Sequence, residues 1–148
     1  MFIREMEPNE LDSVITLFGY YREAADIPED KYDENRVRHT LREYSIRTQL
    51  FLRIALNGQR PVGVIGGFLS EDPVDTDFTA NIQFCYLLPE FTSGYPELIQ
   101  EFITWATACK VTAVRAIDIG NNYERLRDVY ESLDFEVIKL SIMNKEIA

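Results

Sequence analysis

The sequence predicts one domain over residues 1–148, of the α/β (α+β) class, with a mixed sheet and helices on both faces. The length suits a single domain, and apolar residues switch several times between helical and strand spacing. The predicted order is β-α-α-β-β-β-α-β-α-β. Its hairpin-rich first half and alternating second half require antiparallel and parallel strand pairs. Residues 79–119 are expected to form a right-handed parallel crossover.

The first half begins with a short strand, Phe2–Met6. A helix is expected to follow and to end near Ala25, and the charged segment Glu29–Thr48 continues as a second helix. Both helices are predicted from apolar side chains spaced three and four residues apart. These side chains are Leu11, Val14, Ile15 and Phe18 in the first helix, and Val37, Leu41 and Tyr44 in the second.

Three strands come next. Leu50–Leu56 is apolar, and Asn57-Gly58 predicts a hairpin because both residues tolerate positive φ. The return strand, Pro61–Leu69, contains glycines that mark a bulge or a close approach by another group. The third strand, Thr79–Leu88, ends before a proline.

Regular alternation along that third strand predicts two faces. Asn81, Gln83, Cys85 and Leu87 would share one face. Ala80, Ile82, Phe84 and Tyr86 would share the other.

The second half predicts a helix over Tyr95–Cys109, a strand over Thr112–Ile119, a helix over Tyr123–Leu133 and a final strand over Phe135–Met143. Little sequence follows that strand. Its open side could pair with another subunit, so we expect a homodimer.

Composition limits the function. The formal charge of −10 disfavours nucleic acid as a partner, because an acidic surface repels phosphates. No run of eighteen apolar residues predicts a membrane span, and the charged N-terminus does not resemble a signal peptide, so we expect a cytoplasmic protein. Cys85, Cys109 and His39 cannot form a tetrahedral zinc site alone, and no metal is expected.

Three segments resemble the GNAT family of acetyl-CoA-dependent N-acetyltransferases. Val62–Phe68 is similar to the third strand of that family, and Tyr86–Phe91 is similar to the end of its fourth strand. Val129–Phe135 is similar to its "L-Y-x-x-L-G-F" signature. Bacteriophages also encode short, divergent GNAT-like proteins, which makes a phage origin compatible with the resemblance.

The resemblance implies that acetyl-CoA binds beside the fourth strand and at the start of the next helix. A backbone N–H near Leu87, with Leu88 beside it, would hold the thioester carbonyl. The turn Thr92-Ser93-Gly94-Tyr95 would meet the pyrophosphate, with Gly94 permitting positive φ. This turn departs from the family's glycine-rich pattern, and Tyr95 places a bulky side chain where the backbone would approach the ligand. Pro96 also removes one N–H donor.

The resemblance also assigns residues of the last helix. Tyr130 matches the tyrosine that can protonate the CoA thiolate, and its helical phase equally suits a core aromatic. Asn122 lies one residue before the family's usual asparagine position, which Tyr123 occupies here. Among the carboxylates, Asp118 is a candidate base because it lies near the end of a strand.

The implied activity is transfer of an acetyl group to a primary amine of a small molecule, peptide or protein. The acidic loop Ser70–Phe78 would lie near the acceptor entrance and attract a cation. The alternative is a catalytically inactive GNAT-like binding or structural module whose pyrophosphate loop is degenerate. An unrelated α+β binding protein is a third interpretation.

Overall fold

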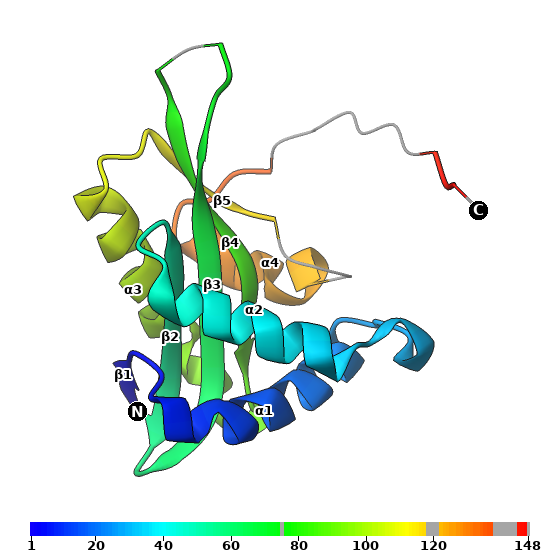
Figure 1. Cartoon of the computed structure of the whole chain (residues 1–148). Helices are drawn as coiled ribbons and strands as arrows, with labels where there is room; N and C mark the ends of the chain where they lie inside the picture. Colours follow the sequence, from blue (N-terminus) through cyan, green and yellow to red (C-terminus); the bar gives the residue numbers. More distant parts are fainter. Residues whose placement is uncertain (75, 118–121, 138–144, 148) are drawn as a thin grey trace.

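The computed structural model describes residues 1–74, 76–117, 122–137 and 145–147 (Figure 1). In this part of the chain the sheet has five strands in the order β1-β2-β3-β4-β5. They are β1 (Phe2–Arg4), β2 (Leu50–Asn57), β3 (Arg60–Glu71), β4 (Phe78–Leu87) and β5 (Ala113–Ala116). The first three pairs are antiparallel, and β4 and β5 are parallel. The predicted mixed sheet is therefore confirmed.

Helices cover both faces of the sheet, as predicted. Figure 1 shows α1 (Leu11–Ala24) and α2 (Glu34–Ile46) on one face, and α3 (Tyr95–Ala108) and α4 (Asn122–Ser132) on the other. Three short 3-10 helices join these elements: η1 (Pro8–Glu10), η2 (Glu29–Lys31) and η3 (Pro89–Gly94).

Local signals explain where the elements begin and turn. The Asp33 carboxylate accepts hydrogen bonds from the backbone N–H groups of Asn35 and Arg36, which caps α2. Because of this cap, α2 begins at Glu34, later than the start of the charged segment Glu29–Thr48. Gly58 turns the β2–β3 hairpin at a φ of 63°, where a side chain would be strained.

Aromatic side chains fill the core on both faces of the sheet. On the α1 face, Phe18 packs edge-on against Phe84 with ring centroids 5.2 Å apart. On the α3 face, Phe51 packs against Phe102 at the same separation and against Trp105 at 5.0 Å. Such pairs stabilise a core beyond the area that they bury.

A β-bulge interrupts β4. Gly67 pairs with Ile82, whereas the preceding residue, Gly66, pairs with Phe84, so Gln83 is an additional residue opposite the two glycines. The bulge predicted from the glycines of the return strand is confirmed.

The alternation predicted for the strand Thr79–Leu88 is wrong across this bulge. Gln83 and Phe84 are neighbours in sequence and would face opposite sides of a regular strand. Both line the same cavity on the α1–α2 face, because the extra residue shifts the phase of the strand.

The C-terminal region is only partly described. Phe135–Val137 does not form a strand, and the rest of the predicted final strand, up to Met143, falls in residues 138–144, outside the described residues. The predicted strand over Thr112–Ile119 is shorter in the structure, with β5 ending at Ala116. The homodimer expected from the open final strand stays a prediction.

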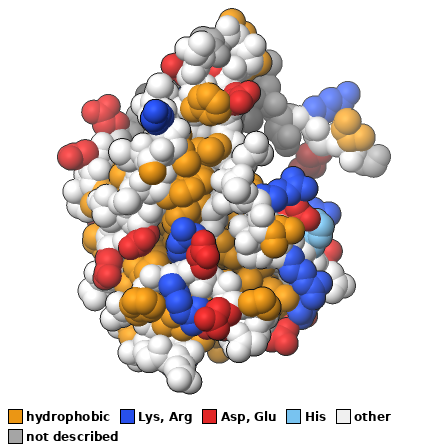
Figure 2. All heavy atoms as spheres, turned by 60° about the vertical axis from the view of Figure 1, so that its left-hand side comes forward, with side chains coloured by type: hydrophobic (Ala, Val, Ile, Leu, Met, Phe, Trp, Pro, Cys, Tyr) orange, Lys and Arg blue, Asp and Glu red, His pale blue; other side chains and the backbone are white. Residues whose placement is uncertain are grey.

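Figure 2 views the molecule from the β1 side. Hydrophobic side chains form a band on this face, with acidic and basic side chains beside them. Two of the ion pairs in the described chain join Arg4 to Glu10 at 2.8 Å and Arg53 to Glu5 at 3.6 Å. Within the described ranges, no helix combines the length and the apolar character that a membrane crossing requires.

We predict that Gly67→Ala destabilises the fold by about 1–3 kcal/mol or more. A Cβ at this position would lie 2.1 Å from the carbonyl oxygen of Asn81 and 2.5 Å from the Phe102 ring, so backbone would have to move. Urea unfolding monitored by circular dichroism measures the change.

Gly19→Ala is the matched control, because nothing lies within 4 Å of its added Cβ. Alanine favours a helix interior over glycine, so this variant should gain up to about 1 kcal/mol. Equal stability of the two variants would show that close packing at the bulge is unimportant.

Candidate functional site

The candidate site is centred on the second half of β4. Pairing between β4 and β5 ends at Ile82 and Ala116, and the last bond joins the Ile117 N–H to the Ile82 carbonyl at 3.0 Å. From Gln83 to Leu87, β4 has no strand partner on that side among the described residues. Strand edges beyond the end of parallel pairing are common ligand sites in α/β sheets.

Tyr95 and Arg125 occupy part of this unpaired edge. The Tyr95 hydroxyl accepts a hydrogen bond from the Leu87 N–H at 2.9 Å, and Nη1 of Arg125 donates to the same oxygen at 2.6 Å. Nη2 of Arg125 donates to the Cys85 carbonyl at 2.8 Å. The phenol and guanidinium thus satisfy two buried backbone groups that an ordinary sheet would pair with a further strand.

Burial raises the pKa of Tyr95 above its usual value, because a phenolate in the core loses its hydration; the positive charge of Arg125 acts in the opposite direction. Tyr95 is 3% exposed. The sequence suggested that this bulky side chain would block the turn before the helix. The structure directs it inward, beneath β4, where it bonds the backbone instead.

The turn that would meet a pyrophosphate is helical. Thr92, Ser93 and Gly94 belong to η3, and the Tyr95 N–H donates to the Thr92 carbonyl. The bonds of a 3-10 helix run from each N–H to the third carbonyl before it, so they use donors that an anion would need.

The expectation that Gly94 uses positive φ is wrong: its φ is −87°. A Cβ there would lie 2.4 Å from the terminal methyl of Met1, a flexible side chain that can move aside, so packing tolerates a small side chain at this position. Thr92 and Ser93 are exposed, and Leu88, which precedes η3, is buried.

The other predicted residues lie in or near α4. The Tyr130 ring is 3% exposed and packs 5.1 Å from the Phe135 ring, as a core aromatic does. Asn122 begins α4. Asp118 lies outside the described residues. Roles for these three residues in catalysis or cofactor binding stay predictions.

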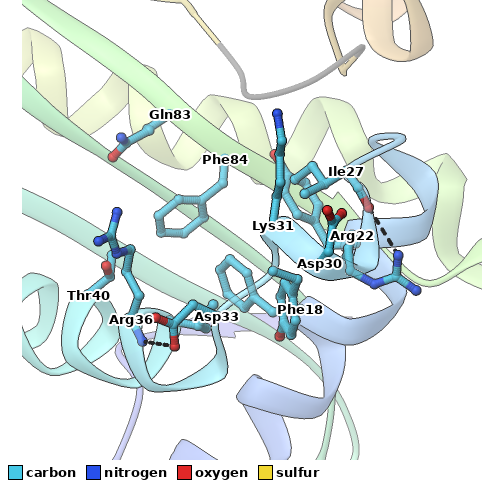
Figure 3. Close-up of a pocket in the computed structure, with 13 residues that line it drawn as sticks. Phe18, Arg22, Ile27, Asp30, Lys31, Asp33, Arg36, Thr40, Gln83 and Phe84 are labelled. Atoms are coloured by element: carbon cyan, nitrogen blue, oxygen red, sulfur yellow. Dashed lines mark hydrogen bonds between the residues drawn. The ribbon is translucent and has the colours of Figure 1, made fainter. Parts of the chain in front are cut away.

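A cavity of about 520 Å³ opens on the opposite side of β4 (Figure 3). Its walls come from the end of α1, the connection through η2, the first half of α2 and the bulge of β4. Phe18 and Phe84 supply aromatic surface, and Gln83 marks the bulge. The Tyr44 hydroxyl donates to Oε1 of Gln83, which fixes that amide from α2. A volume of this size suits a small organic ligand.

The acidic loop lies elsewhere. Figure 1 shows the β3–β4 hairpin projecting from one end of the sheet, and none of the described residues of Ser70–Phe78 lines the cavity. The expectation that this loop lies at the entrance of an acceptor site therefore has no support from this cavity. Nor do the described residues contain a group of three or more side chains suited to hold a metal ion.

Sequence reasoning missed several residues of the site. Arg125 has no local signal, because an arginine on an amphipathic helix usually faces solvent. Lys31 and Arg36 line the cavity from a strongly charged segment, where no single charge stands out. Tyr44 was assigned only to a helical stripe, and its partner lies 39 residues further along the chain.

No protein-family model and no curated protein sequence matches the chain. Solved structures do match it. A probable acetyltransferase is 20% identical, with a TM-score of 0.79 over 100% of this chain and 99% of that one. An aminoglycoside N-acetyltransferase in complex with CoA is 18% identical, with a TM-score of 0.78 over 99% and 95%. The ribosomal-protein-alanine N-acetyltransferase of Brucella melitensis biovar Abortus 2308 is 13% identical, with a TM-score of 0.74 over 99% and 100%.

These likenesses show the fold: the chain has the fold of the GNAT acetyltransferases. They do not favour the interpretation as an inactive module. Two of these neighbours are named for different acceptors, an aminoglycoside and a ribosomal-protein alanine, so the fold does not choose between a small molecule and a protein. A phage origin stays a prediction.

We predict that Tyr95→Phe lowers the free energy of unfolding at pH 7 by about 1–3 kcal/mol, because the Leu87 N–H and Arg125 lose their shared acceptor. Folding raises the pKa of Tyr95 above its value in the unfolded chain, which is about 10 for a tyrosine. The stability that this phenol contributes is therefore complete below pH 10 and is lost as pH rises through the pKa of the folded state. The stability difference between wild type and variant should therefore narrow above pH 10.

Urea titrations at pH 7 to 11 would measure both effects. Tyr20→Phe, at a phenol that is 52% exposed, is the control and should change little. A constant difference across this pH range would contradict the assigned burial of the Tyr95 phenol.

Proposed function

We propose that this chain is an acetyl-CoA-dependent N-acetyltransferase that modifies a primary amine held in the cavity between α1, α2 and β4. One observation carries the proposal. Parallel pairing ends at Ile82, and the cavity reaches β4 at the next two residues, Gln83 and Phe84. A thioester beside the unpaired edge of β4 would therefore lie next to an amine in the cavity, with only the bulge between them. Such proximity is a large part of bimolecular catalysis.

The neighbours support the same reaction class. Their names describe acetyltransferases, and one of them was solved with CoA. In this chain, the shared fold and the position of the cavity support the proposal. The acyl group, the acceptor and the roles of individual residues are parts of the proposal.

The edge of β4 fits the amide-bearing arm of CoA in part. Extended chains with amides pair with free strand edges. Here Tyr95 bonds the Leu87 N–H and Arg125 bonds the Cys85 carbonyl. An acyl oxygen or amide at these two positions would have to exchange with the phenol and the guanidinium. The N–H of Leu87 is then the proposed donor to the thioester oxygen.

The start of α3 is the proposed place for the phosphates. The helix dipole is positive there, and Thr92 and Ser93 expose hydroxyl groups that can donate hydrogen bonds. Hydroxyl donors would replace part of the N–H cradle that η3 and Pro96 remove.

In the transfer itself, the neutral amine nitrogen attacks the thioester carbonyl carbon. A C–N bond forms, the C–S bond breaks, and the thiolate leaves with the bonding electrons. The amine gives up one proton, and the thiolate gains one. We assign the donation to Tyr130, as the resemblance implies, and the acceptance to Asp118, which the sequence places near the end of a strand. A tyrosine pKa near 10 suits protonation of a thiolate.

We predict that Ser93→Glu weakens CoA binding about three- to tenfold, because a carboxylate near the start of α3 repels phosphate by roughly 1 kcal/mol in a solvated setting. A glutamate near a helix N-terminus does not destabilise the helix, so weaker binding would not reflect unfolding. Isothermal titration calorimetry with CoA and with acetyl-CoA measures the change.

Ser93→Gln is the matched control, with nearly the same shape and no charge. Absence of CoA binding to the wild type would contradict the proposed function and favour a GNAT-like module without transferase activity. Equal binding by both variants would move the phosphates away from α3. An acetylation screen over small amines and peptides would then follow confirmed binding.

A further inference from the structure

The cavity has a charge opposite to that of the whole chain. The chain carries a formal charge of −10, yet three cations and two carboxylates line this cavity. The cations are Arg22, Lys31 and Arg36, and the carboxylates are Asp30 and Asp33. A local excess of positive charge on an acidic protein identifies a place where an anion is favoured.

Two of these five side chains already serve the fold. Asp33 accepts two backbone hydrogen bonds at the start of α2, at 3.0 and 3.2 Å. Nη1 of Arg22 donates to the Ile27 carbonyl at 3.0 Å, and its Nη2 lies 3.6 Å from Glu23. Neither side chain is available to a ligand without loss of these contacts.

Lys31 and Arg36 differ from these two. Within the described part of the chain, neither side chain forms a hydrogen bond or an ion pair, although carboxylates are abundant in this segment. Figure 3 shows the Lys31 ammonium and the Arg36 guanidinium on opposite sides of the Phe84 ring, both directed toward the end of the cavity where Gln83 lies. They frame an aromatic surface with two cations that form no ion pair within the described residues, and Asp30 is the remaining carboxylate of the cavity wall.

We propose that the acceptor is a carboxylated amine: a compact molecule with an apolar body that packs on Phe18 and Phe84 and a carboxylate that Lys31 and Arg36 bind. This inference rests on the proposed function, because it names the substrate class of the same cavity. A guanidinium binds carboxylate oxygens through two parallel N–H donors, and the ammonium adds a second charge-assisted bond. A polycationic amine would instead meet two like charges.

The test compares phenylalanine with phenylalaninamide by calorimetry in the absence of CoA. The two probes share the amine and the aromatic body and differ in the carboxylate. Wild type should bind phenylalanine about fivefold or more tightly than the amide. Arg36→Gln and Lys31→Gln should each reduce this ratio toward one, mainly by weakening phenylalanine.

Arg38→Gln is the matched control. It removes the same charge from the same helix, but Arg38 pairs with Asp12 at 2.9 Å and does not line the cavity. The Arg38→Gln variant should prefer phenylalanine over phenylalaninamide by the same factor as wild type. Circular dichroism would show that all the variants are folded.

The proposal is overturned by equal or tighter binding of the amide, by a preference that persists in both cavity variants, or by no binding of either probe at tens of millimolar. A separate CoA titration distinguishes failure of the proposed substrate class from failure of the proposed transferase function. If CoA binds and the carboxylate preference is absent, only the substrate class fails. If the preference is present and CoA does not bind, the carboxylate site stands and the transferase function fails.

Discussion

The bulge at Gln83 is the constraint on which the site depends. Two glycines of β3 lie against the bulged part of β4. A Cβ at Gly66 would collide with the Phe84 ring, and a Cβ at Gly67 would collide with the Asn81 carbonyl oxygen and the Phe102 ring. The extra residue places Gln83 and Phe84 on one face, against α1 and α2. It also coincides with the end of pairing to β5. One local irregularity thus shapes the cavity at the point where the backbone edge beside it loses its strand partner.

The edge of β4 that lacks a strand partner leaves buried backbone groups for Tyr95 and Arg125 to bond. Buried N–H and C=O groups require partners. The phenol and the guanidinium provide them at Leu87 and Cys85, from helices on the same side of the sheet. A ligand that pairs with this edge must match those bonds, because it gains only the difference between its own bonds and the ones that it replaces. The bonds of Tyr95 and Arg125 distinguish this edge from an open strand edge. Under the proposed function, they make the affinity for the cofactor sensitive to Tyr95.

The charge of the cavity is the proposed basis for selecting the acceptor. The surface is acidic overall, which attracts amines generally. At short range, Lys31 and Arg36 favour a ligand that also carries a negative group. An amine with a carboxylate meets both conditions, whereas the fold alone is shared by neighbours named for chemically different acceptors. The fold therefore leaves the acceptor open, and the proposal assigns selection among amines to the side chains at η2 and α2.

The sequence by itself determined the element order as far as α4, the mixed sheet, the Asn57-Gly58 hairpin and the bulge signalled by glycines, because each depends on local periodicity or on backbone freedom. Through the resemblance it also points to the second half of β4 and the start of α3 as a cofactor site, which stays a prediction. Tertiary structure decided the rest. Whether Tyr95 obstructs the turn or bonds Leu87, and whether Arg125 faces solvent or the sheet, depends on partners 8 and 40 residues away. Packing between distant segments also decides which charged side chains lie unpaired beside Phe84. No local pattern in the sequence encodes that packing.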